Sequence, residues 1–455
     1  MIFYRKKHYR VRVLTAFAAA LLASLLLFGL RAADGSCQTP MSVGQVILSA
    51  KEYSLGQVQD RNGTVVLQGK GKETVWTDPQ VRSSLEPVMG EDPERSMLSR
   101  STILANCPWV FGTEDNRFRL SVLLNPFSSR KGEDVRLTID AGLQTGIAQA
   151  VEASGFDKVC LVVSNYKTGE ILGLYGNIMQ DTFHPGSTIK PILAASALSI
   201  DPDLASYIYN CADKNYNFST SSGPFRINCI DGTEHGSINM TDAIAYSCNG
   251  YFVSLLQQTG STAMLKELEK WGFDTVVHYP QFSYTDHSFL GSSRQDCDYL
   301  LAGIGQANAK ITPIGMNMCT NAILNHGQME NPRWISARGR DGRWTAVDGE
   351  GSRQVCSREA ADQICKMMLA VTEKGTGRSF ALPGFAAKTG TAQKSSGNGS
   401  LSDRCTVWTT GGLTDEKMPY SVTVCLDDVK STTTSADAGR LARDILKLVL
   451  KGEAQ

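Results

Sequence analysis

Strand-like segments at both ends of the region from residue 135 to the C-terminus enclose a middle, about 187–380, that is mostly helical in pattern. Each segment is short, apolar and rich in β-branched residues, and polar or glycine-containing turns separate neighbouring ones. The segments are 158–164, 170–175, 385–393, 405–411 and 420–426. Because strands from both ends need partners, the pattern predicts an α+β fold, an α/β sandwich. One central antiparallel sheet is assembled from both ends of the domain and flanked by helices.

Two amphipathic segments are predicted to be helices that cover this sheet. The first, 141–153, follows Asp140, whose side chain suits an N-cap position. The second, 436–451, follows Ser435, which could cap it in the same way. Its apolar face consists of Leu441, Ile445 and Leu448.

The N-terminus combines a basic cluster at 5–12 with an uncharged apolar run at 13–30. At about 1.5 Å per residue, this run is just long enough to cross a bilayer as a helix. The basic side should stay in the cytoplasm, so everything after Arg31 is expected to lie outside. A cleaved signal peptide would give the same location, but no clean cleavage site follows Leu30, which favours an uncleaved anchor.

These patterns divide the chain into four predicted parts. They are a cytoplasmic tail at 1–12, a transmembrane anchor at 13–30, a small strand-rich extracytoplasmic pedestal similar to a dimerisation domain at 31–154, and the main domain at 155–455. The pedestal contains a strand–turn–strand pattern at 57–67 with Asn62-Gly63 as its turn. Lys and Arg together number 45, as do Asp and Glu, and this balance gives no basic excess for binding nucleic acid.

The chain has twelve cysteines, none in a C-x-x-C pair or at zinc-finger spacing. Cys211 and Cys229 flank a polar excursion at 215–223, and we expect them to form a disulfide, with Cα atoms within about 7 Å of each other. A zinc site built from these two residues and His235 is rejected because no fourth ligand stands at a usable spacing. The sequence therefore predicts no metal.

The first pattern that indicates chemistry is Ser187-Thr188-Ile189-Lys190, which follows Pro-Gly and precedes a helix-prone segment at 191–198. Ser187 is predicted at a helix N-terminus, where free N–H groups favour negative charge. Lys190 lies one turn on, and a desolvated lysine can serve as the base that a serine nucleophile needs. His184 suggests a Ser-His-Asp arrangement, but Lys190 already holds the base position. A second S-x-x-K at 128–131 has no helix behind it and is interpreted as surface.

The second pattern, Ser247-Cys248-Asn249, lies in an apolar helix–turn segment at 242–252. A buried serine and asparagine there need hydrogen-bond partners. A satisfied polar turn explains the pattern equally well at this point. Another S-x-N match at 396–398 sits in a Gly/Ser loop and is interpreted as a surface feature.

The third pattern is Lys388-Thr389-Gly390-Thr391 in an apolar strand. Gly390 would let a substrate backbone approach closely. We expect this strand to form one wall of an active-site cleft facing Ser187, with Lys388 near Ser247 and the Thr391 N–H directed at the same cavity. The alternative is an ordinary strand whose lysine extends to solvent.

Together these patterns resemble the S-x-x-K, S-x-N and K-T-G set of penicillin-recognising serine enzymes. Within that family the chain looks most like the class B penicillin-binding proteins, the monofunctional peptidoglycan D,D-transpeptidases. Further similar segments are 60–63, 137–144, 167–172, 305–306 and 312–313. The chain departs from the usual family pattern at Leu55, where arginine is usual, and at Ala307 and Ala387, where glycine is usual.

The resemblance implies a reaction and a role for each residue of the patterns. Ser187 would attack the carbonyl of a D-Ala-D-Ala stem peptide, expel D-Ala and pass the acyl group to an amine of a neighbouring stem. Lys190 would take the proton from Ser187. Ser247, with Lys388, would relay a proton to the leaving nitrogen, and Asn249 would orient the substrate amide.

The resemblance also implies how the substrate is held. Lys388 and Thr389 would bind its terminal carboxylate, with Gly390 allowing close approach. The N–H groups of Ser187 and Thr391 would form the oxyanion hole.

The family implies that the protein acts at the cell membrane in cell-wall synthesis and cell shape, without a cofactor. Peptidoglycan stem peptides would be its substrates, β-lactams its covalent inhibitors and a membrane glycosyltransferase a partner. Two alternatives use the same residues: a D,D-carboxypeptidase or β-lactamase-like hydrolase, and a β-lactam-binding sensor or scaffold. The pedestal and anchor argue against the hydrolase. The intact patterns and the short tail before Val13 argue against the scaffold and the sensor.

Overall fold

The structure is a computed structural model that describes residues 21, 24, 56–70, 73–89, 132–212, 216–220, 223–277, 285–293, 295–349, 351–395 and 401–453. Apart from Leu21 and Ser24, the apolar run at 13–30 lies outside these residues, as do Leu55 and the second S-x-x-K and S-x-N matches. Within the described ranges, no helix combines the length and apolar character that crossing a membrane requires.

The described residues form strands, α-helices and short 3₁₀-helices. The strands are β1 (Val58–Gln59), β2 (Val65–Lys70), β3 (Glu73–Trp76), β4 (Asp134–Leu137), β5 (Val159–Asn165), β6 (Ile171–Tyr175), β7 (Ile208–Cys211), β8 (Tyr216–Thr220), β9 (Gly223–Ile227), β10 (Gly236–Asn239), β11 (Gln328–Glu330), β12 (Ile335–Arg340), β13 (Arg343–Ala346), β14 (Ser352–Gln354), β15 (Phe385–Ser395), β16 (Leu401–Leu413) and β17 (Tyr420–Lys430). The α-helices are α3 (Pro79–Met89), α6 (Ala141–Ser154), α7 (Lys190–Ile200), α8 (Met240–Ala245), α9 (Asn249–Thr259), α10 (Ser261–Lys270), α11 (Asp296–Ala302), α12 (Pro313–Leu324), α13 (Arg358–Glu373) and α14 (Ser435–Glu453). The 3₁₀-helices are η4 (Gly186–Ile189), η5 (Pro202–Ser206), η6 (Ile230–Gly232) and η7 (Arg378–Phe380).

The predicted central sheet is confirmed, and it is assembled from both ends of the domain. It has five antiparallel strands in the order β15-β16-β17-β5-β6. The pairing that joins the two ends is β17 with β5, in which Tyr420 lies opposite Asn165 and Leu426 opposite Val159. Because this ladder links residues far apart in the chain, β5 and β6 lie beside the C-terminal hairpin.

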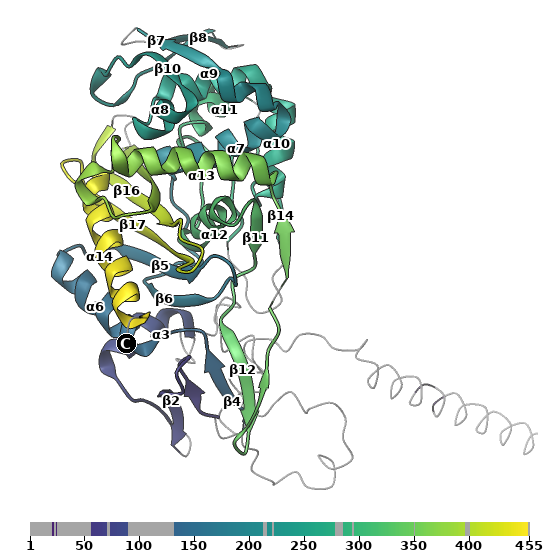
Figure 1. Ribbon diagram of the computed structural model, residues 1–455, viewed down its shortest axis with the longest axis vertical. Coiled ribbons are helices and arrows are strands. Elements are labelled where there is room, and N and C mark those ends of the chain that lie inside the picture. The colour runs from purple at the N-terminus through teal and green to yellow at the C-terminus, as the bar shows by residue number, and fades with distance from the viewer. Residues whose placement is uncertain are drawn as a thin grey trace, which may run out of the picture.

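Each face of the sheet packs against its own helices because side chains alternate along a strand. In β5, Leu161 and Val163 belong to the apolar core that includes α6 and α14, whereas Val162 belongs to the core on the other face. Helices α12 and α13 cover that second face, and α13 runs across the molecule between the sheet and the other helices (Figure 1). The sandwich is therefore helix–sheet–helix, as predicted.

Both predicted covering helices are confirmed. Helix α6 begins after Asp140, whose carboxylate accepts a hydrogen bond from the Leu143 N–H at 2.8 Å. Helix α14 begins at Ser435 itself, so Thr434 rather than Ser435 precedes the first turn. The Asp437 carboxylate reaches back to accept from the Thr434 N–H at 2.9 Å.

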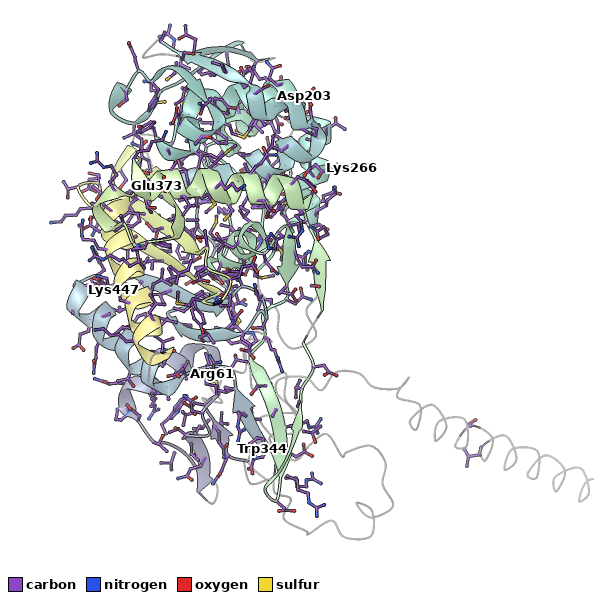
Figure 2. All side chains as sticks on the ribbon, in the orientation of Figure 1. Arg61, Asp203, Lys266, Trp344, Glu373 and Lys447 are labelled. Atoms are coloured by element: carbon purple, nitrogen blue, oxygen red, sulfur yellow. The ribbon has the colours of Figure 1, made fainter. Side chains whose placement is uncertain are left out.

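The middle of the chain contains more strand than its pattern predicted. Strand β7 pairs with β10, β8 with β9, and β11 with β14. The hairpin β12–β13 leaves the main domain and joins a second sheet in the order β13-β12-β4-β1-β2-β3. In Figure 2, Asp203 and Lys266 mark the helical part, and Arg61 and Trp344 mark the part built around this second sheet. The second sheet thus unites strands from both sides of the predicted boundary between residues 154 and 155.

The strand–turn–strand pattern at 57–67 is confirmed as the pair β1–β2. Asp60 closes the turn by accepting hydrogen bonds from the N–H groups of Asn62 at 2.9 Å and Thr64 at 2.7 Å. Its other carboxylate oxygen accepts a hydrogen bond at 3.2 Å from the N–H of Ala141, which is the first residue of α6. One buried carboxylate therefore connects the second sheet to the helix that covers the central sheet.

Replacing Ile445 with alanine is expected to destabilise the fold by about 2–5 kcal/mol, because the fully buried side chain leaves a cavity between α14 and the sheet. Lys447→Ala on the same helix is the matched control, since its side chain is 49% exposed and should change stability by less than about 0.5 kcal/mol. Urea unfolding followed by tryptophan fluorescence measures both. Equal losses would contradict the predicted packing of α14.

Candidate active site

Ser187 lies in the 3₁₀ turn η4, which leads directly into α7. Its side chain is largely buried, at 7% exposure. The predicted helix after Ser187 is confirmed, and Lys190 is its first residue. Pro191 follows at the second position, where a missing N–H costs no hydrogen bond. The local sequence therefore brings a serine and a lysine to the start of one helix.

Lys190 is completely buried, and its ammonium donates to the segment around Ser247. Its Nζ lies 2.8 Å from the Ser247 carbonyl oxygen, 3.2 Å from Ser247 Oγ and 2.7 Å from Asn249 Oδ1. Burial lowers the pKa of Lys190 to about 8, because the charged form loses water. The structure thus joins the first two sequence patterns through this amine.

Ser247 occupies the turn between α8 and α9 with a φ of 60°, in the left-handed region. A non-glycine residue in this region costs roughly 1–3 kcal/mol and persists only when its surroundings hold it. Ser247 Oγ is held by two amines, Lys190 Nζ at 3.2 Å and Lys388 Nζ at 3.1 Å. The sequence left open whether this segment is only a polar turn with satisfied hydrogen bonds. In the structure, the Ser247 hydroxyl bridges the two lysines.

Lys388 lies inside the molecule and does not extend to solvent. It is completely buried, and its Nζ donates to Ser247 Oγ at 3.1 Å and to the Thr389 carbonyl oxygen at 2.8 Å. Burial, and secondly the charge of Lys190, hold the pKa of Lys388 well below its usual range. The expected approach of Lys388 to Ser247 is confirmed, and the solvent-facing alternative for this lysine is wrong.

Thr389 has a partner that the sequence patterns did not reveal. Its hydroxyl lies 2.6 Å from that of Thr376, in the loop after α13. The Thr376 N–H donates to the Ala245 carbonyl oxygen at 3.1 Å, at the end of α8. Thr376 thus links β15 to the turn that carries Ser247. No pattern along the chain indicates this contact, because the two threonines meet only when α13 packs against β15.

Gly390 is required by the chain's own packing. A Cβ at this position would lie 2.8 Å from the Pro185 carbonyl oxygen and 2.9 Å from Thr188 Cγ2. The strand therefore lies directly against η4, as the predicted cleft wall requires. The side of Gly390 where a Cβ would stand is filled by the residues around Ser187. The packing of the chain therefore already requires glycine here, and the close approach of a substrate backbone stays a prediction.

His184 has a structural hydrogen bond. Its Nδ1 lies 2.8 Å from the Ala309 carbonyl oxygen, and burial lowers its pKa. The His184 carbonyl oxygen accepts from Trp408 Nε1 at 3.0 Å. These contacts anchor the loop that precedes Ser187, in agreement with Lys190 rather than His184 being the base candidate.

The glycine departures at Ala307 and Ala387 have different structural settings. Ala307 has a φ of 54°, which glycine adopts freely and which costs an alanine about 1–2 kcal/mol. Ala387 lies opposite Gly411 in the β15–β16 ladder. A Cβ on Gly411 would be 2.8 Å from the Ala387 methyl group. Gly411 therefore leaves the room that Ala387 needs.

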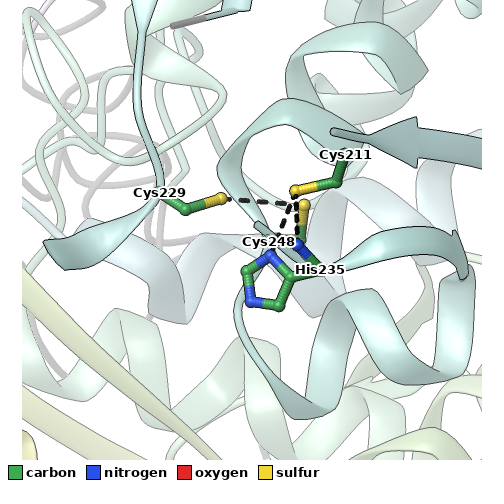
Figure 3. A group of neighbouring side chains, drawn as sticks. All are labelled: Cys211, Cys229, His235 and Cys248. Atoms are coloured by element: carbon green, nitrogen blue, oxygen red, sulfur yellow. Dashed lines mark hydrogen bonds between the residues drawn. The ribbon is translucent and has the colours of Figure 1, made fainter. Parts of the chain in front are cut away.

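The expected Cys211–Cys229 disulfide is wrong, because neither residue forms a disulfide bond. Their sulfur atoms face His235 and Cys248 instead (Figure 3). The donor atoms of the four side chains all lie within 4.8 Å of one another. The sequence predicted no metal because a fourth ligand was missing, and Cys248 of the S-x-N pattern supplies one.

Comparison with known proteins gives a match to one protein family and to several curated relatives. Residues 159–447 match the family model described as the penicillin binding protein transpeptidase domain. The peptidoglycan D,D-transpeptidase MrdA of Acinetobacter baumannii is 27% identical over 318 residues, covering 58% of this chain and 45% of the relative. Stage V sporulation protein D of Bacillus subtilis is 25% identical over 358 residues, covering 70% and 54%. The chain spans about half the length of these curated relatives.

The fold is shared with a solved structure, that of penicillin-binding protein A from Mycobacterium tuberculosis in a ceftriaxone acyl-enzyme complex. The TM-score is 0.73 at 20% sequence identity, and the match covers 89% of this chain and 100% of the chain in that structure. The mixed α/β architecture described above is therefore that of a known transpeptidase fold.

Gly305 supports the segment before Ser187, and replacing it with alanine is expected to disturb that segment. Its φ is +73°, and a Cβ would lie 2.0 Å from the Gly186 carbonyl oxygen. Gly155→Ala is the matched control, because Gly155 has a φ of +71° and no atom lies within 4 Å of the position that a Cβ would take. The free energy of unfolding of the control should fall by about 1–2 kcal/mol from backbone strain alone, and that of Gly305→Ala should fall by more. Chemical denaturation of both variants measures the difference, and equal losses would contradict the close approach.

Proposed function

Because the chain belongs to the penicillin binding protein transpeptidase domain family, we propose that it is a peptidoglycan D,D-transpeptidase whose nucleophile is Ser187. The observation that carries this proposal is the position of Ser247 Oγ between Lys190 and Lys388. A hydroxyl in this position can pass protons between two amines whose pKa values are both lowered by burial. The proposal is supported by the chain path, because the turn that holds Ser187 leads directly into the helix that begins with Lys190.

In the proposed acylation step, neutral Lys190 takes the proton from Ser187 Oγ as the oxygen attacks the carbonyl carbon of the penultimate D-Ala. An ammonium has three N–H donors, and Lys190 makes three hydrogen bonds to the Ser247–Asn249 segment. A neutral amine keeps two N–H groups and a lone pair. Ser247 is the partner that can adapt, because a hydroxyl donates as well as accepts.

Expulsion of the terminal D-Ala requires a proton on its nitrogen. Ser247 donates that proton in the proposed mechanism and is itself reprotonated by Lys190 or Lys388. The carbon–nitrogen bond breaks, and an ester to Ser187 remains. Transfer to an acceptor amine reverses these proton movements: the amine attacks the ester, loses its proton through the same groups and returns the hydroxyl to Ser187.

Substrate binding in this proposal uses the β15 wall and Asn249. Asn249 Nδ2 donates to the Asn228 carbonyl oxygen at 2.7 Å, so its side chain is held in a fixed orientation. A substrate carboxylate beside Lys388 and Thr389 would favour the charged form of the lysine, which burial otherwise opposes. The backbone N–H groups of Ser187 and Thr391 are the proposed oxyanion hole.

We also propose that the protein works at the outer surface of the cell membrane, anchored through 13–30, with the pedestal at 31–154 carrying the domain at 155–455. The basic cluster at 5–12 and the uncharged run after it support this proposal. The substrates would be peptidoglycan stem peptides, and a membrane glycosyltransferase would supply the strands to be cross-linked.

The second candidate function is hydrolysis of the same acyl-enzyme, as in a D,D-carboxypeptidase or β-lactamase. The same residues serve both reactions, and they differ in whether an amine or water attacks the ester. Incubation with a stem-peptide donor and an amine acceptor separates them. Cross-linked product supports the transpeptidase, and free tetrapeptide alone supports the hydrolase.

A fluorescent penicillin is expected to label wild-type protein and to leave Ser187→Ala unlabelled, because the ester can form only at that oxygen. Ser196→Ala is the matched control: it is a buried serine on the same helix, its hydroxyl has no hydrogen-bond partner in the described structure, and its variant should label normally. Mass spectrometry should map the adduct to Ser187. An adduct on Ser128 or Ser247 would overturn the assignment.

The acylation rate is expected to rise about tenfold between pH 7 and pH 9, because the neutral fraction of an amine with a pKa of about 8 rises by that factor. The sign follows from burial, which lowers the pKa; the nearby Cys248 and Cys229 oppose it. Stopped-flow measurements with a chromogenic β-lactam give the rate, and Ser187→Ala provides the blank for hydrolysis by hydroxide. A flat or falling profile would exclude Lys190 as the base.

A further inference from the structure

Three buried thiols and one imidazole converge behind the S-x-N turn. Cys211 lies at the end of β7, Cys229 directly before η6, His235 directly before β10, and Cys248 at the N-cap of α9. Their donor atoms all lie within 4.8 Å of one another (Figure 3). We propose that Cys211, Cys229, His235 and Cys248 bind a zinc ion.

The distances in the cluster suit a tetrahedral metal. With zinc–sulfur bonds of about 2.3 Å and zinc–nitrogen bonds of about 2.0 Å, neighbouring donor atoms stand about 3.5–3.8 Å apart. Cys229 Sγ lies 3.8 Å from Cys248 Sγ, and Cys211 Sγ lies 3.2 Å from His235 Nδ1. A disulfide needs about 2.0 Å between its sulfur atoms. The cysteines are therefore spaced as metal ligands.

All three sulfurs accept hydrogen bonds from backbone N–H groups. His235 N donates to Cys211 Sγ at 3.2 Å, Asn249 N to Cys229 Sγ at 3.2 Å, and Tyr251 N to Cys248 Sγ at 3.5 Å. Such donors stabilise a thiolate, and helix N-termini do the same. Donors of this kind commonly surround metal ligands and orient them. These hydrogen bonds are independent of the spacing between the donor atoms, and they also indicate that the three sulfurs can carry negative charge.

Cys229 and Cys248 are both buried, and their sulfur atoms lie next to each other at 3.8 Å. Two adjacent thiolates repel each other in a buried site. A divalent ion removes this conflict, because each sulfur can then lose its proton and bond to the metal.

The ligand set favours zinc over calcium and magnesium. Thiolate and imidazole ligands in a Cys₃His set are typical of structural zinc, whereas calcium and magnesium prefer oxygen. Four protein ligands leave no open position for water. The three sulfurs are buried and His235 is half-buried, so the imidazole marks the side nearest solvent. The ion is therefore expected to act in structure and not in the chemical step.

The position of the cluster gives the zinc a consequence for the proposed reaction. Cys248 separates Ser247 from Asn249, and the Asn249 N–H bonds to the Cys229 sulfur. A metal bonded to both cysteines would fix the strained turn whose other face is held by Lys190. This consequence rests on the proposed transpeptidase function, whereas the existence of the zinc site does not.

Zinc content tests the site directly. Full-length protein purified under reducing conditions without chelator is expected to carry about one zinc ion per chain by elemental mass spectrometry. Replacing the metal with cobalt(II) should give the intense thiolate charge-transfer and tetrahedral d–d bands of a Cys₃His site. Loss of one ligand in Cys211→Ser or His235→Ala should weaken zinc binding by more than the roughly 10- to 100-fold typical of changes to outer partners.

Matched variants keep the test independent of folding. Cys356→Ser removes a buried thiol elsewhere in the main domain and should retain zinc. His235→Cys keeps four ligands and should restore most of the binding that His235→Ala loses. Three results would each overturn the proposal. The first is wild-type protein that stays free of zinc after incubation with zinc. The others are equal zinc contents in wild type and Cys211→Ser, and a disulfide within the cluster of the purified protein.

The link to catalysis has its own readout. Chelation of wild-type protein should slow β-lactam acylation, and added zinc should restore it, while Ser187→Ala should keep its zinc and remain unlabelled. Zinc without labelling in the wild type would count against the proposed function and not against the site. Labelling without zinc would count against the site alone.

Discussion

The arrangement of the site depends on one hydroxyl that accepts hydrogen bonds from two fully buried amines. Ser247 Oγ lies 3.2 Å from Lys190 Nζ and 3.1 Å from Lys388 Nζ. Burying a charged amine is costly unless it is paired or hydrogen-bonded, and these lysines donate to neutral hydroxyl, amide and carbonyl oxygens. The lowered pKa values are the physical result. A pKa of about 8 keeps the Lys190 amine close to the point at which it can gain or lose a proton at neutral pH.

Three separate parts of the fold must meet for that hydroxyl to be held. The start of α7 supplies one amine, the strand β15 supplies the other, and the turn between α8 and α9 supplies Ser247 with its left-handed backbone. The loop after α13 connects two of these parts, since Thr376 bonds both Thr389 and the end of α8. Antiparallel pairing of β17 with β5 joins the two parts of the sheet in which β15 is an edge strand. Strain at Ser247 is therefore balanced by contacts that come from the whole domain.

The cysteine cluster lies against the same turn from another direction. Cys248 caps α9 and separates the two polar residues of the S-x-N pattern, so the backbone that positions Ser247 also carries a sulfur into the cluster. A zinc ion there would supply rigidity to a turn that neither a regular helix nor a sheet stabilises. The cluster thereby offers a physical reason for cysteine at the centre of the pattern, where the side chain takes no part in the proposed chemistry.

The sequence by itself determined the features that depend on neighbouring residues. The apolar strand segments, the Asp140 cap, the apolar face of α14 and the serine–lysine pair at the start of α7 all depend on residues close together in the chain, where periodicity and capping act. Resemblance to a family then grouped the three patterns. Only the tertiary structure decided the contacts between distant segments: the Thr376 bond, the hairpin β12–β13 in the second sheet, and Cys248 beside Cys211 in place of a disulfide. Such contacts depend on how all the elements pack together, and no spacing along the chain encodes which side chains that packing brings face to face.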